Sequence, residues 1–245
     1  MSGPDAERRE ISVGCAELPA GMARRLYFQK VRFLEARLPG DQIPGERILR
    51  RWRTEAGADG RFALVAPREL CELHLPAADT GGHAALARRL ADAAKQLAAA
   101  AVVFATPPQV TPGSTHRDAL RRFFEEIATT ELFGGAVRVW QPDGLWRPPV
   151  LARVARELGV VPAQDPLAPD PLEEGSAPPP GEVAYVRVPG LGRANRPLGD
   201  DDLSRLAEWL EPCRRGFVVF DTPAKLRDAI GLSRWVGSSG ATSWN

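Results

Sequence analysis

The stretch AAVVFAT, residues 100–106, is short, almost wholly apolar and interrupted by no charged side chain. A second stretch of the same kind, GFVVFD, covers residues 216–221. Apolar runs of this length are typical of strands that are buried on both faces, as in a parallel sheet covered by helices. We therefore expect a parallel sheet whose size depends on how many such runs the chain contains.

Six further runs predict strands, and stretches with helical spacing separate most of them. The strands are expected at residues 11–15, 30–36, 61–66, 135–140, 159–163 and 182–188. Helices are expected at residues 21–28, 44–55, 83–99, 115–127, 149–158, 201–213 and 222–235. Eight strands alternating with seven helices in 245 residues favour a closed (β/α)8 TIM-like barrel. An open, doubly wound sheet is the alternative.

The sixth helix of such a barrel has no convincing counterpart. In its place stands DPLAPDPLEEGSAPPPG, residues 165–181, whose prolines predict an irregular surface loop. We expect one TIM-like barrel domain over residues 11–236. A flexible N-terminus is expected at residues 1–10 and a small, polar, disordered tail at residues 237–245.

Composition narrows the classes of partner. The 32 basic residues nearly cancel the 31 acidic ones, for a formal net charge of +1, which disfavours nucleic acid and anionic membranes as partners. No apolar stretch approaches the ~18 residues of a membrane span, and the polar start lacks the apolar core of a secretion signal. The three widely spaced cysteines, Cys15, Cys71 and Cys213, indicate reduced thiols in a cytoplasmic protein.

A series of short motifs, taken in order and spacing, resembles the YecE-like family, also called domain of unknown function 72 (DUF72), over most of the chain. The matching segments are Val13-Gly14, Leu34-Glu35, residues 48–52 (ILRRW) with 62–65 (FALV), residues 104–108 (FATPP), Trp146, residues 185–187 (YVR) and residues 219–221 (VFD). The resemblance implies a TIM-like barrel and a family without an established activity. The chain resembles a divergent member of this family.

Several polar residues that the resemblance would place at the barrel opening are replaced. The replacements are residues 36–39 (ARLP), Ala66, Cys71-Glu72, Arg138 or its neighbour, Pro189 and Asp221-Thr222. Glu35 and Arg187 are retained. The resemblance therefore implies a degenerate site.

Catalytic candidates are sought at the C-terminal ends of the strands, because only the loops there converge on one cavity. Glu35 is the candidate acid/base, Arg187 the electrostatic clamp and Asp221 a second polar group. Glu35 paired with Asp221 or Asp143 would suit glycoside hydrolysis, which needs two nearby carboxyl groups. A structural ion pair between Glu35 and Arg187 is the competing interpretation.

Ligand-binding candidates lie in the loops around the same opening. Arg37 follows strand two, and Trp146 could stack a sugar or base or instead pack in the core. The loop after strand seven could bind an anion through its backbone, or be a plain loop; its candidates are Gly190, Gly192, Arg193 and Asn195. Since this loop is not GxGxxG, no dinucleotide cofactor is expected.

A metal site is not expected either, because His74, His83 and His116 lie away from the predicted strand ends.

Two functions stay open. The first is a non-catalytic binding or scaffold module with a small anionic or sugar-like ligand, or a protein partner. The second is a metal-independent hydrolase or related enzyme acting on a sugar-like or phosphorylated ligand. An open cavity surrounded by Glu35, Arg187 and Asp221 would favour the enzyme. A barrel opening filled by Arg37, Trp140 and Pro189 would favour the binding module.

Overall fold

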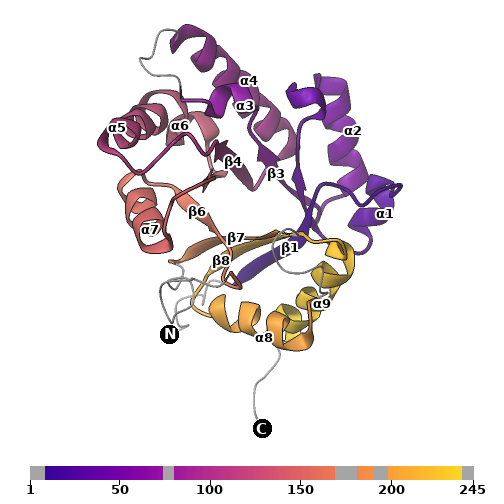
Figure 1. Ribbon diagram of the computed structural model, residues 1–245. Coiled ribbons are helices and arrows are strands. Elements are labelled where there is room, and N and C mark those ends of the chain that lie inside the picture. Colours follow the sequence, from indigo (N-terminus) through magenta and orange to yellow (C-terminus); the bar gives the residue numbers. More distant parts are fainter. Residues whose placement is uncertain (1–8, 74–79, 169–180, 190–197, 239–245) are drawn as a thin grey trace, which may run out of the picture.

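Eight parallel strands close into a barrel in the order in which they occur along the chain (Figure 1). The computed structural model describes residues 9–73, 80–168, 181–189 and 198–238. The strands are β1 (Glu10–Ala16), β2 (Phe33–Ala36), β3 (Arg61–Val65), β4 (Ala101–Thr106), β5 (Val137–Pro142), β6 (Val161–Gln164), β7 (Val183–Pro189) and β8 (Arg215–Asp221). The prediction of a (β/α)8 TIM-like barrel is confirmed.

Helices surround the barrel (Figure 1). The α-helices are α1 (Arg24–Phe28), α2 (Glu46–Ala56), α3 (Arg68–Cys71), α4 (Thr80–Leu97), α5 (Ser114–Arg122), α6 (Thr130–Phe133), α7 (Pro148–Glu157), α8 (Asp200–Trp209) and α9 (Lys225–Ser238). A 3-10 turn, η1 (Pro39–Asp41), follows β2, and a π-helical turn, η2 (Phe123–Ile127), continues α5. The sequence did not predict α3 and α6, which are single turns too short to show an apolar periodicity.

Two expectations fall largely outside the described residues. The proline-rich loop expected in place of the sixth helix lies mostly at residues 169–180, and the expected flexible termini lie mostly at residues 1–8 and 239–245. β1 begins at Glu10, inside the expected flexible N-terminus, and α9 runs to Ser238, inside the expected disordered tail. Within the described ranges, no helix has both the length and the apolar content that a membrane-spanning segment requires.

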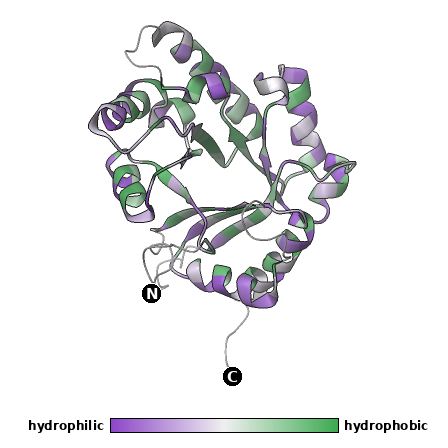
Figure 2. Ribbon diagram, in the orientation of Figure 1, coloured by the Kyte–Doolittle hydropathy of each residue, from purple (hydrophilic) through white to green (hydrophobic). Residues whose placement is uncertain are grey.

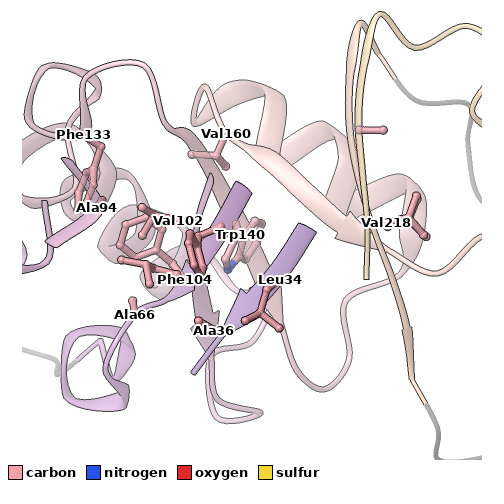
Figure 3. Packing of buried hydrophobic residues seen from close by; sticks show 14 of the residues in the cluster. Leu34, Ala36, Ala66, Ala94, Val102, Phe104, Phe133, Trp140, Val160 and Val218 are labelled. Atoms are coloured by element: carbon pink, nitrogen blue, oxygen red, sulfur yellow. The ribbon is translucent and has the colours of Figure 1, made fainter. Parts of the chain in front are cut away.

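The core has two layers, one inside the barrel and one between the barrel and its helices. Alternate strand residues fill the interior, among them Phe33, Val103, Tyr185 and Phe217. The residues between them face the helices; the rings of Phe104 on β4 and Phe133 on α6, for example, lie 5.5 Å apart (Figure 3). Hydrophobic residues accordingly follow the strands, whereas the helices carry both apolar and polar residues (Figure 2). This alternation decides which polar side chains enter the barrel.

A tyrosine hydroxyl bridges backbone groups of β1 and β2. The amide of Cys15 donates to Tyr27 Oη over 2.8 Å, and this hydroxyl donates to the carbonyl oxygen of Phe33 over 2.6 Å. Gly14 leaves room for the arrangement, since a Cβ there would lie 1.7 Å from the same carbonyl oxygen. Burial raises the pKa of Tyr27, which keeps the hydroxyl protonated and able to donate.

Candidate functional site

The three candidate catalytic residues meet at the C-terminal end of the barrel, called the mouth below. Arg187 on β7 donates from Nε to Oε1 of Glu35 on β2 over 3.2 Å. Its Nη2 donates to Oδ2 of Asp221 on β8 over 2.9 Å. Glu35 and Arg187 are 152 residues apart in the chain, and barrel closure brings them together. Their contact is established, whereas their roles in catalysis stay a prediction.

Tyr185 is a fourth member of this group that sequence reasoning missed. Its hydroxyl donates to Oε2 of Glu35 over 2.6 Å, inside the barrel and one inward-facing position below Arg187. Complete burial, together with the charge of Glu35, raises the pKa of Tyr185 well above its usual value, so the hydroxyl stays a donor. Strand alternation could have identified it, because residues two apart on β7 face the same side. Glu35, Tyr185, Arg187 and Asp221 are called the ion-pair network below.

Burial divides the ion-pair network into a hidden and an accessible part. The side chain of Glu35 is 1% exposed and that of Arg187 is 13% exposed, whereas that of Asp221 is 42% exposed. Burial by itself would lower the pKa of Arg187, but the charges of Glu35 and Asp221 outweigh burial and raise it. Arg187 is therefore a permanent cation held between two carboxylates, and Glu35 has both oxygens bonded to protein groups.

A cavity of about 770 Å³ opens beside this network. Its lining comes from the ends of β1 to β5 and the loops that follow them. It includes the charged residues Glu17, Arg37, Arg68 and Asp143, the uncharged polar residues Thr106, Gln109 and Gln141, and the apolar residues Val65 and Ala105. Glu35, Arg187 and Asp221 do not line it. The open volume and the ion-pair network thus occupy different parts of the mouth.

Of the candidate ligand-binding residues that the structure describes, Arg37 lines this cavity and Trp146 does not, and the side chain of Arg37 is exposed. Glu17, which the sequence did not single out, lines it too: its backbone has a positive φ of 56°, and its amide donates to the carbonyl oxygen of Glu35 over 2.8 Å. A non-glycine residue rarely adopts this conformation, so the bond to β2 helps to hold Glu17 at the rim.

The two tryptophans of β5 and the following loop pack in the core. Trp140 is buried and its indole N–H donates to Thr106 Oγ1 over 3.0 Å, so it does not fill the mouth as one alternative required. The indole N–H of Trp146 donates to the carbonyl oxygen of Val110 over 2.7 Å, and its ring meets that of Trp140 edge to face at 4.7 Å. Its geometry therefore fits the packing interpretation better than ligand stacking.

Three further described residues, Arg138, Cys15 and Cys71, do not line this cavity. Arg138 points out of the barrel, where it donates to the carbonyl oxygens of Phe124, Ala128 and Gly159, so it cannot replace a polar residue at the mouth. Cys15 and Cys71 are buried, and burial raises the pKa of the Cys15 thiol to about 11. The loop candidates Gly190, Gly192, Arg193 and Asn195 lie outside the described residues.

Among the described residues, no group of three or more His, Cys, Asp or Glu side chains is placed to hold a metal ion. His83 Nε2 lies 3.2 Å from the carbonyl oxygen of Glu69, and His116 Nδ1 lies 3.0 Å from Thr111 Oγ1. His74 is outside the described ranges.

No protein-family model matches the chain, and no curated protein matches it. Similar solved structures include a DUF72 family protein from Thermotoga maritima, 12% identical with a TM-score of 0.66, covering 93% of this chain and 99% of that one. A DUF72 family protein from Enterococcus faecalis is 11% identical with a TM-score of 0.64, covering 94% and 99%. A D-psicose 3-epimerase from Clostridium cellulolyticum, solved with D-tagatose, is 11% identical with a TM-score of 0.60, covering 97% and 91%. At these identities the likeness establishes the fold: the chain is a (β/α)8 barrel of the form found in DUF72 proteins, the family that its sequence resembles.

Proposed function

We propose that the chain is a divergent DUF72-type barrel whose mouth binds a small, neutral, sugar-like ligand without converting it. The main observation against catalysis is the burial of Glu35, whose side chain is 1% exposed. One of its carboxylate oxygens accepts a hydrogen bond from Tyr185 and the other accepts one from Arg187. A general acid or base must lie within hydrogen-bond reach of the substrate atom that it serves. Glu35 lacks such access, which supports a degenerate site.

The placement of Arg187 also argues against glycoside hydrolysis by the carboxyl pair Glu35 and Asp221. Such a pair must flank the bond that is cleaved. Here the guanidinium of Arg187 bonds to both Glu35 and Asp221 and thereby occupies the space between them. The pair is better suited to holding Arg187 in place than to acting on a substrate.

The cavity beside the network supports the ligand class. Its volume of about 770 Å³ is in the usual range for a small-molecule site, roughly 300–1,000 Å³. The lining carries the carboxylates of Glu17 and Asp143 and the guanidinium groups of Arg37 and Arg68, of which Arg68 also bonds to Glu72 over 2.6 Å. The amides of Gln109 and Gln141 add both donors and acceptors. A lining with charges of both signs and both kinds of hydrogen-bonding group favours a hydroxyl-rich neutral ligand over a strongly charged one. The D-psicose 3-epimerase with D-tagatose shows that a similar barrel holds a sugar.

The test is thermal unfolding of the protein with a panel of monosaccharides, sugar phosphates, nucleotides and divalent metals. A neutral monosaccharide at about 100 times its Kd should raise the unfolding midpoint by roughly 5–10 °C. Arg37→Gln and Gln141→Ala should reduce that shift. Arg25→Gln, which removes an exposed charge on α1 outside the cavity, should leave the shift unchanged. A panel that gives no shift, or a shift only with sugar phosphates, contradicts the neutral ligand.

A metal-independent hydrolase or related enzyme acting on a sugar-like or phosphorylated ligand is the second candidate, favoured by the convergence of Glu35, Arg187 and Asp221. To distinguish the enzyme from the binding module, the stabilising ligand is incubated with the protein and the chemical structure of the ligand is followed by NMR. An unchanged ligand supports the binding module. Conversion that is lost in both Glu35→Gln and Asp221→Asn supports the enzyme. A protein partner and a cytoplasmic location stay predictions from the sequence.

A further inference from the structure

A second cavity, of about 930 Å³, lies at the end of the barrel opposite the mouth. Its walls are the beginning of β1, the turns that lead into β2 and β3, and the last part of α9. The charged residues that line it are Arg9, Glu10, Lys30, Arg32, Asp59 and Arg61. It is called the N-terminal cavity below, and it shares no lining residue with the cavity at the mouth.

The two carboxylates of the N-terminal cavity are already paired. Glu10 Oε1 lies 2.5 Å from Arg61 Nη2, and Asp59 Oδ2 lies 3.6 Å from Arg32 Nη1. Among the described residues, neither Arg9 nor Lys30 has a carboxylate within ion-pair distance, since the ion pairs of the lining join other residues. By this count the lining carries two cations that no described acid compensates.

Of these two cations, Arg9 is the one with buried nitrogen atoms that lack hydrogen-bond partners among the described residues. Its Nε and Nη2 atoms are shielded from solvent, and no described residue accepts a hydrogen bond from either of them. Guanidinium nitrogens that lose hydration without gaining a hydrogen-bond partner destabilise the folded state. A negative charge placed in the cavity would remove much of this penalty, because Coulomb attraction is strong where water is partly excluded.

We propose that the N-terminal cavity binds a small dianionic oxyanion of the phosphate type, free or as a phosphate monoester, with Arg9 and Lys30 as its charge partners. The charge count sets the ligand class, since two uncompensated cations match the roughly two negative charges of a phosphate monoester above its second pKa of about 6. Arginine is suited to this partner because its planar guanidinium bonds phosphate oxygens with two N–H groups. The site is independent of the sugar-like ligand proposed for the mouth.

The test measures the unfolding midpoint of the full chain with inorganic phosphate against acetate at the same ionic strength. At about 100 times its Kd, phosphate should raise the midpoint by roughly 5–10 °C at pH 7.5, and by less at pH 5.5, where it is a monoanion. Arg9→Gln and Lys30→Gln should each lose most of this shift. The matched control Arg25→Gln, which removes an exposed arginine of α1 outside the cavity, should keep it.

A second readout separates loss of the site from damage to the fold. Without phosphate, Arg9→Gln should unfold at the same temperature as the unmodified protein or higher, because the substitution removes an uncompensated charge. Broadening of the phosphorus NMR signal by the unmodified protein, but not by Arg9→Gln, should accompany binding. Equal phosphate shifts in the unmodified protein, Arg9→Gln and Arg25→Gln would indicate a general salt effect and overturn the proposal. So would the absence of any shift.

Discussion

Single side chains decide what the mouth can do. A carboxylate as buried as that of Glu35 is tolerated only if its oxygens find partners, and Tyr185 and Arg187 supply them. Asp221 then balances part of the charge that Arg187 brings with it. The ion-pair network is thus complete without a substrate, which is the reason for preferring a structural role for Glu35 over a catalytic one.

Replacing Tyr185 tests this interpretation at the level of one hydroxyl. Tyr185→Phe leaves an oxygen of a buried carboxylate without its donor, so we expect the free energy of unfolding to fall by about 1–3 kcal/mol. When Glu35 is already replaced by Gln, Tyr185→Phe should lower the free energy of unfolding by less. The difference, which is the coupling energy between the two sites, should be about 0.5–3 kcal/mol. Urea denaturation of the four proteins measures both values. Effects that simply add would show that Tyr185 and Glu35 do not depend on each other.

The buried thiols predict how stability changes at high pH. Burial raises the pKa of Cys15 and of Cys213 from 9.0 to about 11, so between these values the folded chain keeps protons that the unfolded chain loses. The resulting stability is fully present below pH 9 and is lost as the pH rises through about 11. The urea midpoint should therefore fall between pH 8.5 and 10.5, roughly following this linkage. The urea midpoint of Cys213→Ala should fall less steeply over the same pH range. An equally steep fall would contradict this role of the thiol.

At the level of elements, Arg138 on β5 joins the end of η2 to the turn that follows α7. The helix expected at residues 115–127 is instead α5 followed by the π-helical turn η2, where the amide of Ala128 reaches back to the carbonyl oxygen of Phe123. This turn leaves the carbonyl oxygen of Phe124 to accept from Arg138, which also binds those of Ala128 and Gly159. One side chain on β5 therefore closes the ends of two helical segments.

Arg138→Lys should show how much this linkage contributes. A lysine keeps the charge but its single ammonium group cannot reach three carbonyl oxygens in the geometry of a guanidinium. We expect a loss of about 1–3 kcal/mol in the free energy of unfolding, measured by urea denaturation. Arg153→Lys, an exposed position on α7, serves as the control and should change it by less than about 0.5 kcal/mol. Similar values for both variants would assign no special role to Arg138.

For the molecule as a whole, β6 is the weakest part of the closed barrel. It has four residues, one of which is Pro162, and it pairs with β5 and β7 through two residue pairs on each side. β7 and β8, in contrast, pair through seven. A strand with few ladder bonds should open more easily than its neighbours.

Amide hydrogen exchange under native conditions tests this difference. The amides of Val161, Ala163 and Gln164 should exchange at least about tenfold faster than those of β4 and β8, because a local opening of β6 breaks few bonds. Mass spectrometry of peptides covering these strands gives the comparison. Equal protection across the barrel would mean that it opens only as a unit.

The sequence by itself determined those features that depend on neighbouring residues. Apolar runs such as residues 100–106 and 216–221 form strands, and their alternation with helical stretches was enough to identify the barrel. The retained Glu35 and Arg187 could be named as partners, because both stand at predicted C-terminal strand ends, which meet at one side of a barrel. Local patterning and the handedness of parallel connections carry this information.

Only the tertiary structure decided which side chains face each other across the barrel. The inward turn of Tyr185 and the outward turn of Arg138 depend on strand register, since a shift of one residue reverses every side chain of a strand. The extra turns α3 and α6, the π-helical η2 and both cavities arise from packing between segments far apart in sequence. Such contacts form only once the barrel closes, and no local pattern of residues encodes their geometry.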